Sequence, residues 1–195
     1  MQAPYYKIEY FLRAITEPNG SACQRILADH RKLFQLVQGS GHNHQAWPGG
    51  YIDHVTEVMN IANVLYTSLS QVRCLSFSIS DLLLVLFLHD LEKPWKYEID
   101  AHGKLTYRKD LENKKAQQEF RMQKIKEYGI VLTQEQENGL KYVEGEMGDY
   151  SKERRVMGPL AAMAHMCDIA SARIWHNFPL WKESDSWEGA ERFRD

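Results

Sequence analysis

Apolar and polar positions along this chain recur mainly with the period of an α-helix. Apolar side chains are spaced three and four residues apart, which places them on one face of a helix. This pattern predicts helices over residues 5–17, 21–38, about 51–69, 78–92, about 111–128, 133–145 and 157–175. Ser21 is a candidate N-cap of the second helix, and Ser78 or Ser80 is a candidate N-cap of the fourth.

Residues 95–108, with the sequence WKYEIDAHGKLTYR, follow a different pattern. Apolar side chains alternate with polar ones around the turn-like pair His102-Gly103, which is typical of a β-hairpin. Residues 39–50 are rich in glycine and are expected to form a loop. No linker or repeat divides the chain. We therefore expect an all-α helical bundle with one small β-hairpin insertion, folded as a single domain over residues 1–195.

Composition limits the classes of protein to which the chain could belong. With 44% hydrophobic and 26% charged residues it resembles an ordinary globular protein, and its net charge of −2 gives no basic surface for duplex nucleic acid. The N-terminal residues are charged too early for a signal peptide, and no stretch reaches the roughly 20 apolar residues of a membrane span. Cys23, Cys74 and Cys167 are odd in number and far apart, which favours reduced thiols. We expect a cytoplasmic protein without a membrane partner.

An apolar run ends directly in charged residues near the middle of the chain. Leu82 to Leu88 are all apolar, and His89 and Asp90 follow them without a break. A long apolar run predicts burial, and an ionised carboxylate is costly to bury without a partner. The sequence therefore raises the question of what compensates Asp90.

Two further polar side chains are expected on apolar helix faces. His54 shares a face with Val58, and Asp168 shares one with Ala164. Taken singly, an inward histidine is commonly a hydrogen-bonded core residue, and Asp168 could pair with an arginine. Those explanations need a separate partner for each residue, whereas one divalent cation would compensate the whole set. The candidate metal ligands are His54, His89, Asp90 and Asp168.

The order of these residues resembles the H…HD…D signature of the HD-domain metal-dependent phosphohydrolases. The segment HDLEK, with Lys93 at its end, resembles the frequent H-D-x-x-K of that superfamily. The loop HNHQAWPGGYIDH resembles the lead-in HHAYPGGLLEH of one branch, and HMCDIASAR resembles the closing AD-x-x-SAR helix. The resemblance covers roughly residues 40 to 175 and implies an HD-domain helical bundle with phosphohydrolase activity.

Roles for individual residues follow from this resemblance and from their positions. A metal-activated water would attack the phosphate, with Asp90 both ligating the metal and orienting that water. Lys93 would offset the negative charge that develops on the phosphate. His44 could contact the phosphate or protonate the leaving oxygen, although it could also be an ordinary polar loop residue. Arg155 and Arg173 are the candidate phosphate-binding cations.

The chain departs from superfamily members that bind two or three metals. Those members add histidines between the HD pair and the last aspartate, where this chain has only His102 and His165. The predicted helix near LKYVEGEMGDY carries Glu144 and Glu146 instead. We expect one divalent cation (Mn, Co, Fe, Ni, Zn or Mg), because a mixed imidazole and carboxylate site does not select one metal. Glu144 could act as a base or hold a weaker second ion, or both glutamates could be surface charges.

The resemblance implies hydrolysis of a nucleotide phosphate ester, most closely a (deoxy)nucleoside 5′-phosphate, by a nucleotidase or triphosphohydrolase. The glycine-rich lead-in also resembles that of HD-type exonucleases, so a phosphodiesterase acting on cyclic nucleotides or short oligonucleotides is an alternative. Trp47 and Trp95 could stack on a base or close the core. A helical interaction module with a silent metal site is an alternative of another class. Its homodimer surface could include Trp175, Trp181 and Trp187.

Overall fold

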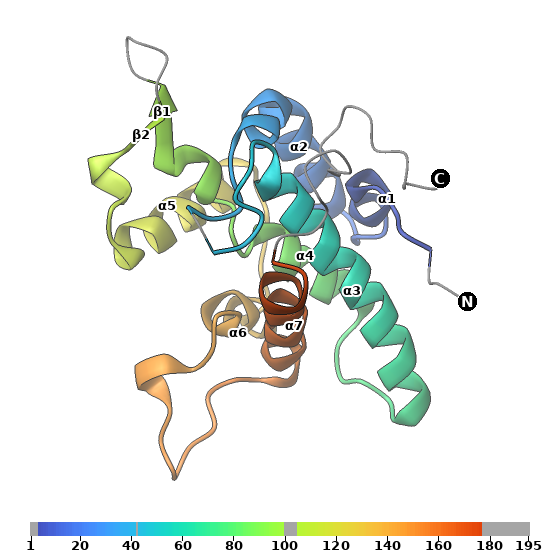
Figure 1. The fold of residues 1–195 in the computed structure, drawn as a ribbon. Helices are drawn as coiled ribbons and strands as arrows, with labels where there is room; N and C mark the ends of the chain where they lie inside the picture. Colours follow the sequence, from blue (N-terminus) through green and yellow to red (C-terminus); the bar gives the residue numbers. More distant parts are fainter. Residues whose placement is uncertain (1–3, 42, 100–104, 177–195) are drawn as a thin grey trace.

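The computed structural model describes residues 4–41, 43–99 and 105–176 (Figure 1). The described α-helices are α1 (Ile8–Arg13), α2 (Asn19–Leu36), α3 (Gly50–Val72), α4 (Ile79–Leu88), α5 (Lys114–Glu127), α6 (Gln134–Tyr142) and α7 (Pro159–Ile169). The short helical turns are η1 (Lys93–Lys96), η2 (Lys109–Leu111), η3 (Met147–Asp149) and the π-helical η4 (Ala170–Ile174). Strands β1 (Tyr97–Ile99) and β2 (Leu105–Tyr107) form an antiparallel hairpin in which Tyr97 pairs with Tyr107. The mostly helical fold and the single small hairpin among these residues confirm the coarse prediction.

Several helix ends differ from those predicted. Ser78 caps α4 as expected, because its side chain accepts the Asp81 N–H while the Asp81 carboxylate accepts the Ser78 N–H. The proposal of Ser21 as an N-cap is wrong: it lies inside α2, and its hydroxyl donates to Glu17 Oε1 at 2.8 Å. The predicted helix 133–145 is also too long, since α6 ends at Tyr142.

Helix α4 is the centre of the hydrophobic core. It contacts α1, α2, α3, α6 and α7, and every side chain from Leu82 to Leu88 is buried. A helix that is apolar on all sides needs neighbours on all sides, which explains its unbroken apolar sequence. Because α4 is buried along this length, the residues at its C-terminal end, His89 and Asp90, are buried as well.

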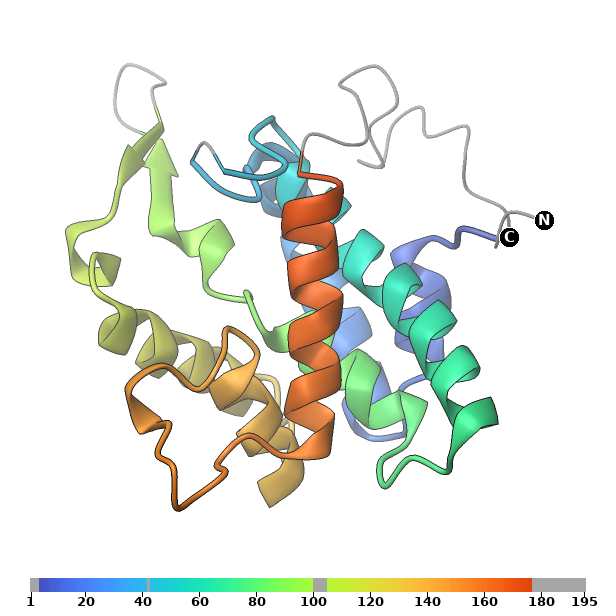
Figure 2. The same ribbon diagram turned by 60° about the horizontal axis from the view of Figure 1, so that its bottom comes forward.

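Helix α7 crosses the middle of the molecule, with α3 on one side and α6 on the other (Figure 2). Both α3 and α7 also contact α4. Helices α3 and α4, which are consecutive in the sequence, therefore meet α7, which lies far from both along the chain. The β1–β2 hairpin lies at the edge of the molecule, near α5 (Figure 1).

The loop before α3 folds tightly against the start of that helix. Gly49, the N-cap residue of α3, has φ 84°, a left-handed conformation that glycine adopts at little cost. A Cβ on Gly50 would lie 1.9 Å from the backbone oxygen of Gln45, so a side chain there would force the loop away. These two glycines allow the loop to place His44 and Gln45 next to the helices.

Some sequence-based expectations concern residues that the structure does not describe. His102 and the hairpin turn, and Trp181 and Trp187 of the C-terminal segment, lie outside the described ranges. Within those ranges, the helices are all too short or too polar to cross a membrane. The three cysteines are free thiols, as expected: Cys23 and Cys167 are buried, and Cys74 is exposed.

Candidate metal centre

One side-chain atom from each of three helices meets in the interior. His54 is on α3, His89 directly follows α4, and Asp168 is on α7. Their ligand atoms lie within 4.8 Å of one another, and this group could hold a metal ion. Asp168 Oδ1 lies 3.2 Å from His54 Nε2 and 3.7 Å from His89 Nε2. The helix-face patterns of the sequence predicted His54 and Asp168, and the apolar run from Leu82 to Leu88 predicted His89.

Asp90, the fourth predicted ligand, lies beside this group. Its Oδ2 is 3.2 Å from His89 Nε2 and 3.7 Å from His54 Nε2. The same oxygen is 2.5 Å from Lys93 Nζ. The structure thus brings the four predicted ligands together, with Lys93 in contact with one of them.

Hydrogen bonds to the histidine Nδ1 atoms show which ring nitrogens are available to a metal. His89 Nδ1 donates to the Leu86 carbonyl at 2.6 Å, since a carbonyl can only accept. His54 Nδ1 lies 3.0 Å from Ser171 Oγ, whose proton is donated to Glu57 Oε2 at 2.9 Å. The Ser171 oxygen therefore accepts from His54 Nδ1–H. When the rings are neutral, each carries its proton on Nδ1 in this arrangement, which leaves the Nε2 lone pairs facing the centre.

Both Nε2 atoms are buried and make no hydrogen bond of ordinary geometry with the described residues, although each lies 3.2 Å from a carboxylate oxygen. Buried polar atoms normally have a hydrogen-bond partner, so two such nitrogens in one place need an explanation. A divalent cation accepts imidazole lone pairs and compensates the adjacent carboxylates. The residues present therefore fit a divalent metal ion.

A buried polar network that the sequence analysis did not find supports His54. Gln45 Nε2 donates to Glu57 Oε2 at 3.2 Å, and Glu57 in turn accepts from Ser171. Gln45, Glu57 and Ser171 are all buried. Glu57 follows His54 by three residues and Ser171 follows Asp168 by three, so each lies one turn along the same helix face. That spacing is the signal by which Glu57 and Ser171 could have been identified in the sequence.

Opposite charges in the site stabilise one another and thereby shift the pKa values of its histidine and aspartate side chains. Burial lowers the pKa of His89, but Asp90 and Asp168 outweigh burial and raise it to about 10. Burial alone would raise the pKa of Asp90, but His89 and Lys93 hold it well below its usual range. In the same way, His54 and His89 outweigh burial and hold the pKa of Asp168 below its usual range. A bound cation would replace the proton on His89 as the compensating charge.

Arg121 on α5 supports the end of α4 from the other side. Its buried guanidinium donates from Nη1 to the His89 carbonyl and lies 3.7 Å from Glu92 Oε2. Burial and the nearby Asp90 raise the pKa of Glu92. Neither Arg121 nor Glu92 is evident as a supporting residue from the sequence, because each resembles an ordinary surface charge there.

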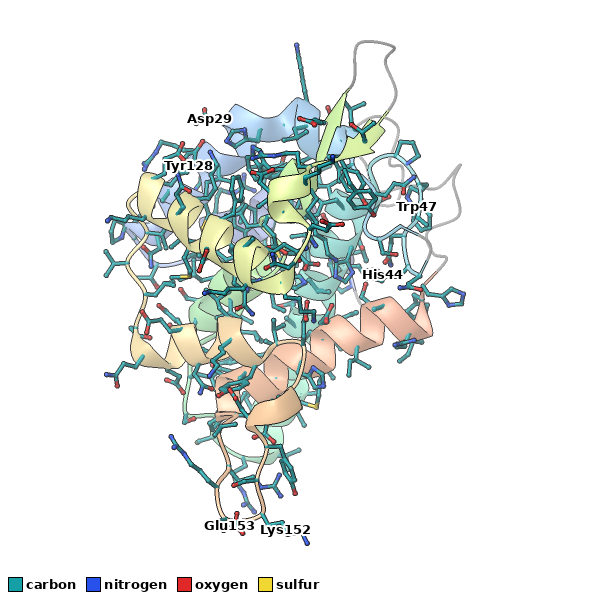
Figure 3. All side chains as sticks on the ribbon, turned by 90° about the vertical axis from the view of Figure 1, so that its left-hand side faces the viewer. Asp29, His44, Trp47, Tyr128, Lys152 and Glu153 are labelled. Atoms are coloured by element: carbon teal, nitrogen blue, oxygen red, sulfur yellow. The ribbon has the colours of Figure 1, made fainter. Side chains whose placement is uncertain are left out.

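His44 is the one predicted substrate-binding residue that reaches the centre. Its ring centroid lies 4.7 Å from that of His54, and Figure 3 shows it on the loop before α3, next to α7. Its Nδ1 lies 2.8 Å from Gln45 Oε1. Burial, together with His54 and Lys93, lowers the pKa of His44 to about 4.

The two predicted phosphate-binding arginines are exposed and are not in this group. The guanidinium of Arg155 lies 5.9 Å from the ring centroid of Tyr150. It follows the tip of the α6–α7 connection, which Lys152 and Glu153 mark far from His44 in Figure 3. Arg173 is on η4.

The two glutamates considered as ligands of a second ion make other contacts in the structure. Glu144 is exposed and forms an ion pair with Lys114. Glu146 accepts the backbone N–H groups of Val156 and Met157, at 3.1 and 2.9 Å. Both follow the end of α6, so the prediction that a helix near LKYVEGEMGDY carries them is wrong. His165, also considered, has its Nδ1 2.6 Å from the Val143 carbonyl and is not in the group.

The two tryptophans beside the motifs contact the protein itself. Trp47 Nε1 donates to Asp53 Oδ2 at 2.7 Å. The Trp95 ring packs edge-on against His30 and Phe34 and has Lys124 Nζ 5.1 Å from its centroid. These contacts favour the interpretation that Trp95 closes the core.

Comparisons with known proteins do not assign this geometry to a family. A scan against protein-family models, a search of curated proteins and a search of solved structures each found no match.

Proposed function

We propose that this protein is a metal-dependent phosphohydrolase of the HD-domain type, which cleaves a phosphate ester of a nucleotide. The observation that carries the proposal is the convergence of two buried histidine Nε2 atoms on the carboxylate of Asp168, with the carboxylate of Asp90 beside them. The reaction class is inferred from the order of these ligands and from the segments around them, which resemble the H…HD…D signature. The nucleotide as substrate rests on that resemblance.

His54, His89 and Asp168 would hold the cation, with Asp90 next to them. When bound, a divalent cation lowers the pKa of a coordinated water and polarises a phosphoryl oxygen. Asp90 Oδ2 is within 3.7 Å of both histidine Nε2 atoms, a position from which it can accept a hydrogen bond from the attacking water. Lys93, in contact with the same oxygen, holds Asp90 in place and supplies positive charge beside the phosphate.

His44 would contact the substrate or the attacking water as a hydrogen-bond acceptor. The Gln45 amide nitrogen donates to Glu57, so its oxygen faces His44 and accepts from Nδ1–H. That bond leaves His44 Nε2 with a lone pair beside the His54 ring. This tautomer suits neither of the two roles expected for His44, because a lone pair can neither protonate a leaving oxygen nor donate to a phosphate oxygen. It can accept from a substrate hydroxyl or from the attacking water.

Metal analysis and a substrate screen test this proposal together. The purified protein is assayed for metal content and then supplied with Mn, Co, Fe, Ni, Zn or Mg and with mono-, di-, tri- and cyclic nucleotides. Chromatography of the products identifies the bond that is cleaved. We expect near-stoichiometric metal and hydrolysis of at least one nucleotide class.

Variants link the activity to the site. His89→Ala and Asp168→Ala should lose both metal and hydrolysis, whereas the matched control His176→Ala, at an exposed position, should retain both. Hydrolysis and metal content that persist in His89→Ala would overturn the proposal. Absence of hydrolysis with every metal, or of metal binding altogether, would favour the helical interaction module.

A further inference from the structure

A cavity of about 470 Å³ adjoins the metal centre. Its walls come from the loop before α3, from η1, from both strands of the hairpin, from η2 and from the start of α5. The volume is in the range of small-molecule sites. The hairpin and η2 supply residues to this cavity and none to the group of His54, His89 and Asp168.

Positive charge dominates the lining of this cavity. Its charged residues are Lys93, Lys96, Arg108, Lys109 and Glu112. Three of the cations also contact a carboxylate that is not part of the lining. Lys93 contacts Asp90 at 2.5 Å, Lys96 lies 3.8 Å from Glu92, and Arg108 contacts Asp110 at 2.5 Å. These carboxylates hold the cationic side chains in position, while the surface that faces the cavity carries one acidic residue.

The hairpin adds an aromatic surface to the same cavity. The rings of Tyr97 and Tyr107 lie 4.7 Å apart between centroids, and their hydroxyl oxygens are 3.0 Å apart. Tyr107 is 64% exposed although its ring packs against that of Tyr97. An exposed aromatic face beside cations suits a ligand that carries both a planar ring and phosphate groups.

Lys93 connects the cavity to the metal centre. It lines the cavity, and its ammonium group contacts Asp90 Oδ2, which is 3.2 Å from His89 Nε2. A phosphate attacked at the metal centre would use Lys93 and the metal. Lys96, Arg108 and Lys109 are then left for further negative charge on the same ligand.

We propose that this cavity binds the phosphate groups of a nucleotide beyond the one that is attacked, so that the enzyme prefers substrates with at least two phosphates. Lys96, Arg108 and Lys109 would determine this preference. The inference rests on the proposed function, since it takes the attacked phosphate to lie at the metal centre. The additional phosphates could belong to a nucleoside di- or triphosphate or to a short oligonucleotide.

Binding measurements that avoid turnover test the inference. Isothermal titration calorimetry on the metal-loaded protein, at a fixed excess of free Mg²⁺, compares adenosine analogues with one, two and three phosphorus groups. In each analogue, methylene groups replace the 5′-oxygen and every bridging oxygen. A diadenosine with a 5′-methylenephosphonate and a phosphorothioate linkage forms the oligonucleotide arm. Because the base is the same throughout, the comparison isolates the number of phosphates.

The test variant is the double substitution Lys96→Ala with Lys109→Ala. Its control is Lys115→Ala with Lys126→Ala, two exposed lysines of α5 that do not line the cavity and that change the net charge equally. We expect each extra phosphate to improve affinity about tenfold in the unmodified protein, the effect of one charge-assisted hydrogen bond. The test variant should lose this gain while binding the monophosphate within about threefold of the unmodified protein, and the control should keep the gain.

Each outcome supports or contradicts the proposed binding of further phosphates in the cavity. A gain with the triphosphate analogue alone identifies a polyphosphate chain as the ligand, and a gain with the dinucleotide alone identifies a sugar–phosphate backbone. The inference is overturned if the analogues with one and three phosphates bind with equal affinity. It is also overturned if the test and control variants lose affinity equally. Hydrolysis of monophosphates without a preference for further phosphates would also overturn the inference, but it would leave the proposed function intact. Tight binding through Lys96 and Lys109 without hydrolysis of any nucleotide would overturn the proposed function instead.

Discussion

His54 and Ser171 are 117 residues apart in the sequence, yet His54 Nδ1 lies 3.0 Å from Ser171 Oγ. Ser171 donates its own proton to Glu57 Oε2, so its oxygen can only accept from the imidazole. This bond holds the proton of His54 on Nδ1 and turns Nε2 toward Asp168, 3.2 Å away. Residues that orient a ligating histidine in this way tune the affinity of the metal site.

Ser171→Ala should weaken metal binding without unfolding the protein. Loss of such an orienting partner typically costs roughly 10- to 100-fold in metal affinity. Competition with a chelating dye measures the affinity, and circular dichroism checks the helical content. Ser70→Ala is the matched control, because the Ser70 hydroxyl donates to the Thr67 carbonyl at an exposed position. Unchanged affinity in Ser171→Ala would show that His54 does not depend on this bond.

Lys93→Met should retain the metal but slow hydrolysis, by on the order of 10²-fold in kcat. Lys93 contacts Asp90 Oδ2 and is not itself a ligand, because an ammonium group has no lone pair. Metal content and kcat are measured on the same preparation, and Lys93→Arg should recover part of the rate. Metal loss as complete as that of His54→Ala would instead assign Lys93 to the structural support of the site.

Glu144→Gln should change neither metal content nor activity appreciably. Its exposed carboxylate pairs with Lys114 beyond the end of α6, and the group of candidate ligands among the described residues does not include it. We therefore expect about one tightly bound metal ion per chain. Elemental analysis of the unmodified protein and of the variant checks this number. Two fully occupied ions, with one lost in Glu144→Gln, would restore the role that the sequence analysis considered.

Arg121→Leu should destabilise the protein by about 1–3 kcal/mol, the typical effect of leaving a buried polar group without its hydrogen bond. The substitution removes the donor to the His89 carbonyl and the cation nearest to Glu92 Oε2. Urea unfolding followed by circular dichroism measures the change. Arg25→Leu is the control, since Arg25 donates to the Tyr128 carbonyl at an exposed position and should cost at most about 0.5 kcal/mol. Equal losses in the two variants would argue against a supporting role for Arg121.

Thiol titration should detect one reactive cysteine in the folded protein. Burial raises the pKa of both Cys23 and Cys167 to about 12, so neither is a thiolate at pH 8. Cys74 is exposed and should react with a disulfide reagent at that pH. All three should react in urea. Rapid modification of Cys23 or Cys167 without denaturant would indicate that the core around α2 or α7 opens readily.

Features that depend only on residues close together in the sequence could be predicted from it. The helical period predicted the helices, and it placed His54 and Asp168 on inward faces because residues three and four apart share a face. The apolar run from Leu82 to Leu88 predicted a helix buried on all sides, and it therefore placed His89 and Asp90 in the interior. The four candidate ligands were found in this way.

Contacts between elements far apart in the chain were decided only by the tertiary structure. The sequence contains Ser171, Glu57 and Gln45 but not the distances that join them to His54, because those distances depend on how α3, α7 and the loop pack together. The early end of α6 left Glu144 on the surface with Lys114. The hairpin and η2 brought Arg108 and Lys109 to the same cavity as Lys93. Local periodicity shows which way a side chain faces on its own helix, but only packing determines which side chain it meets.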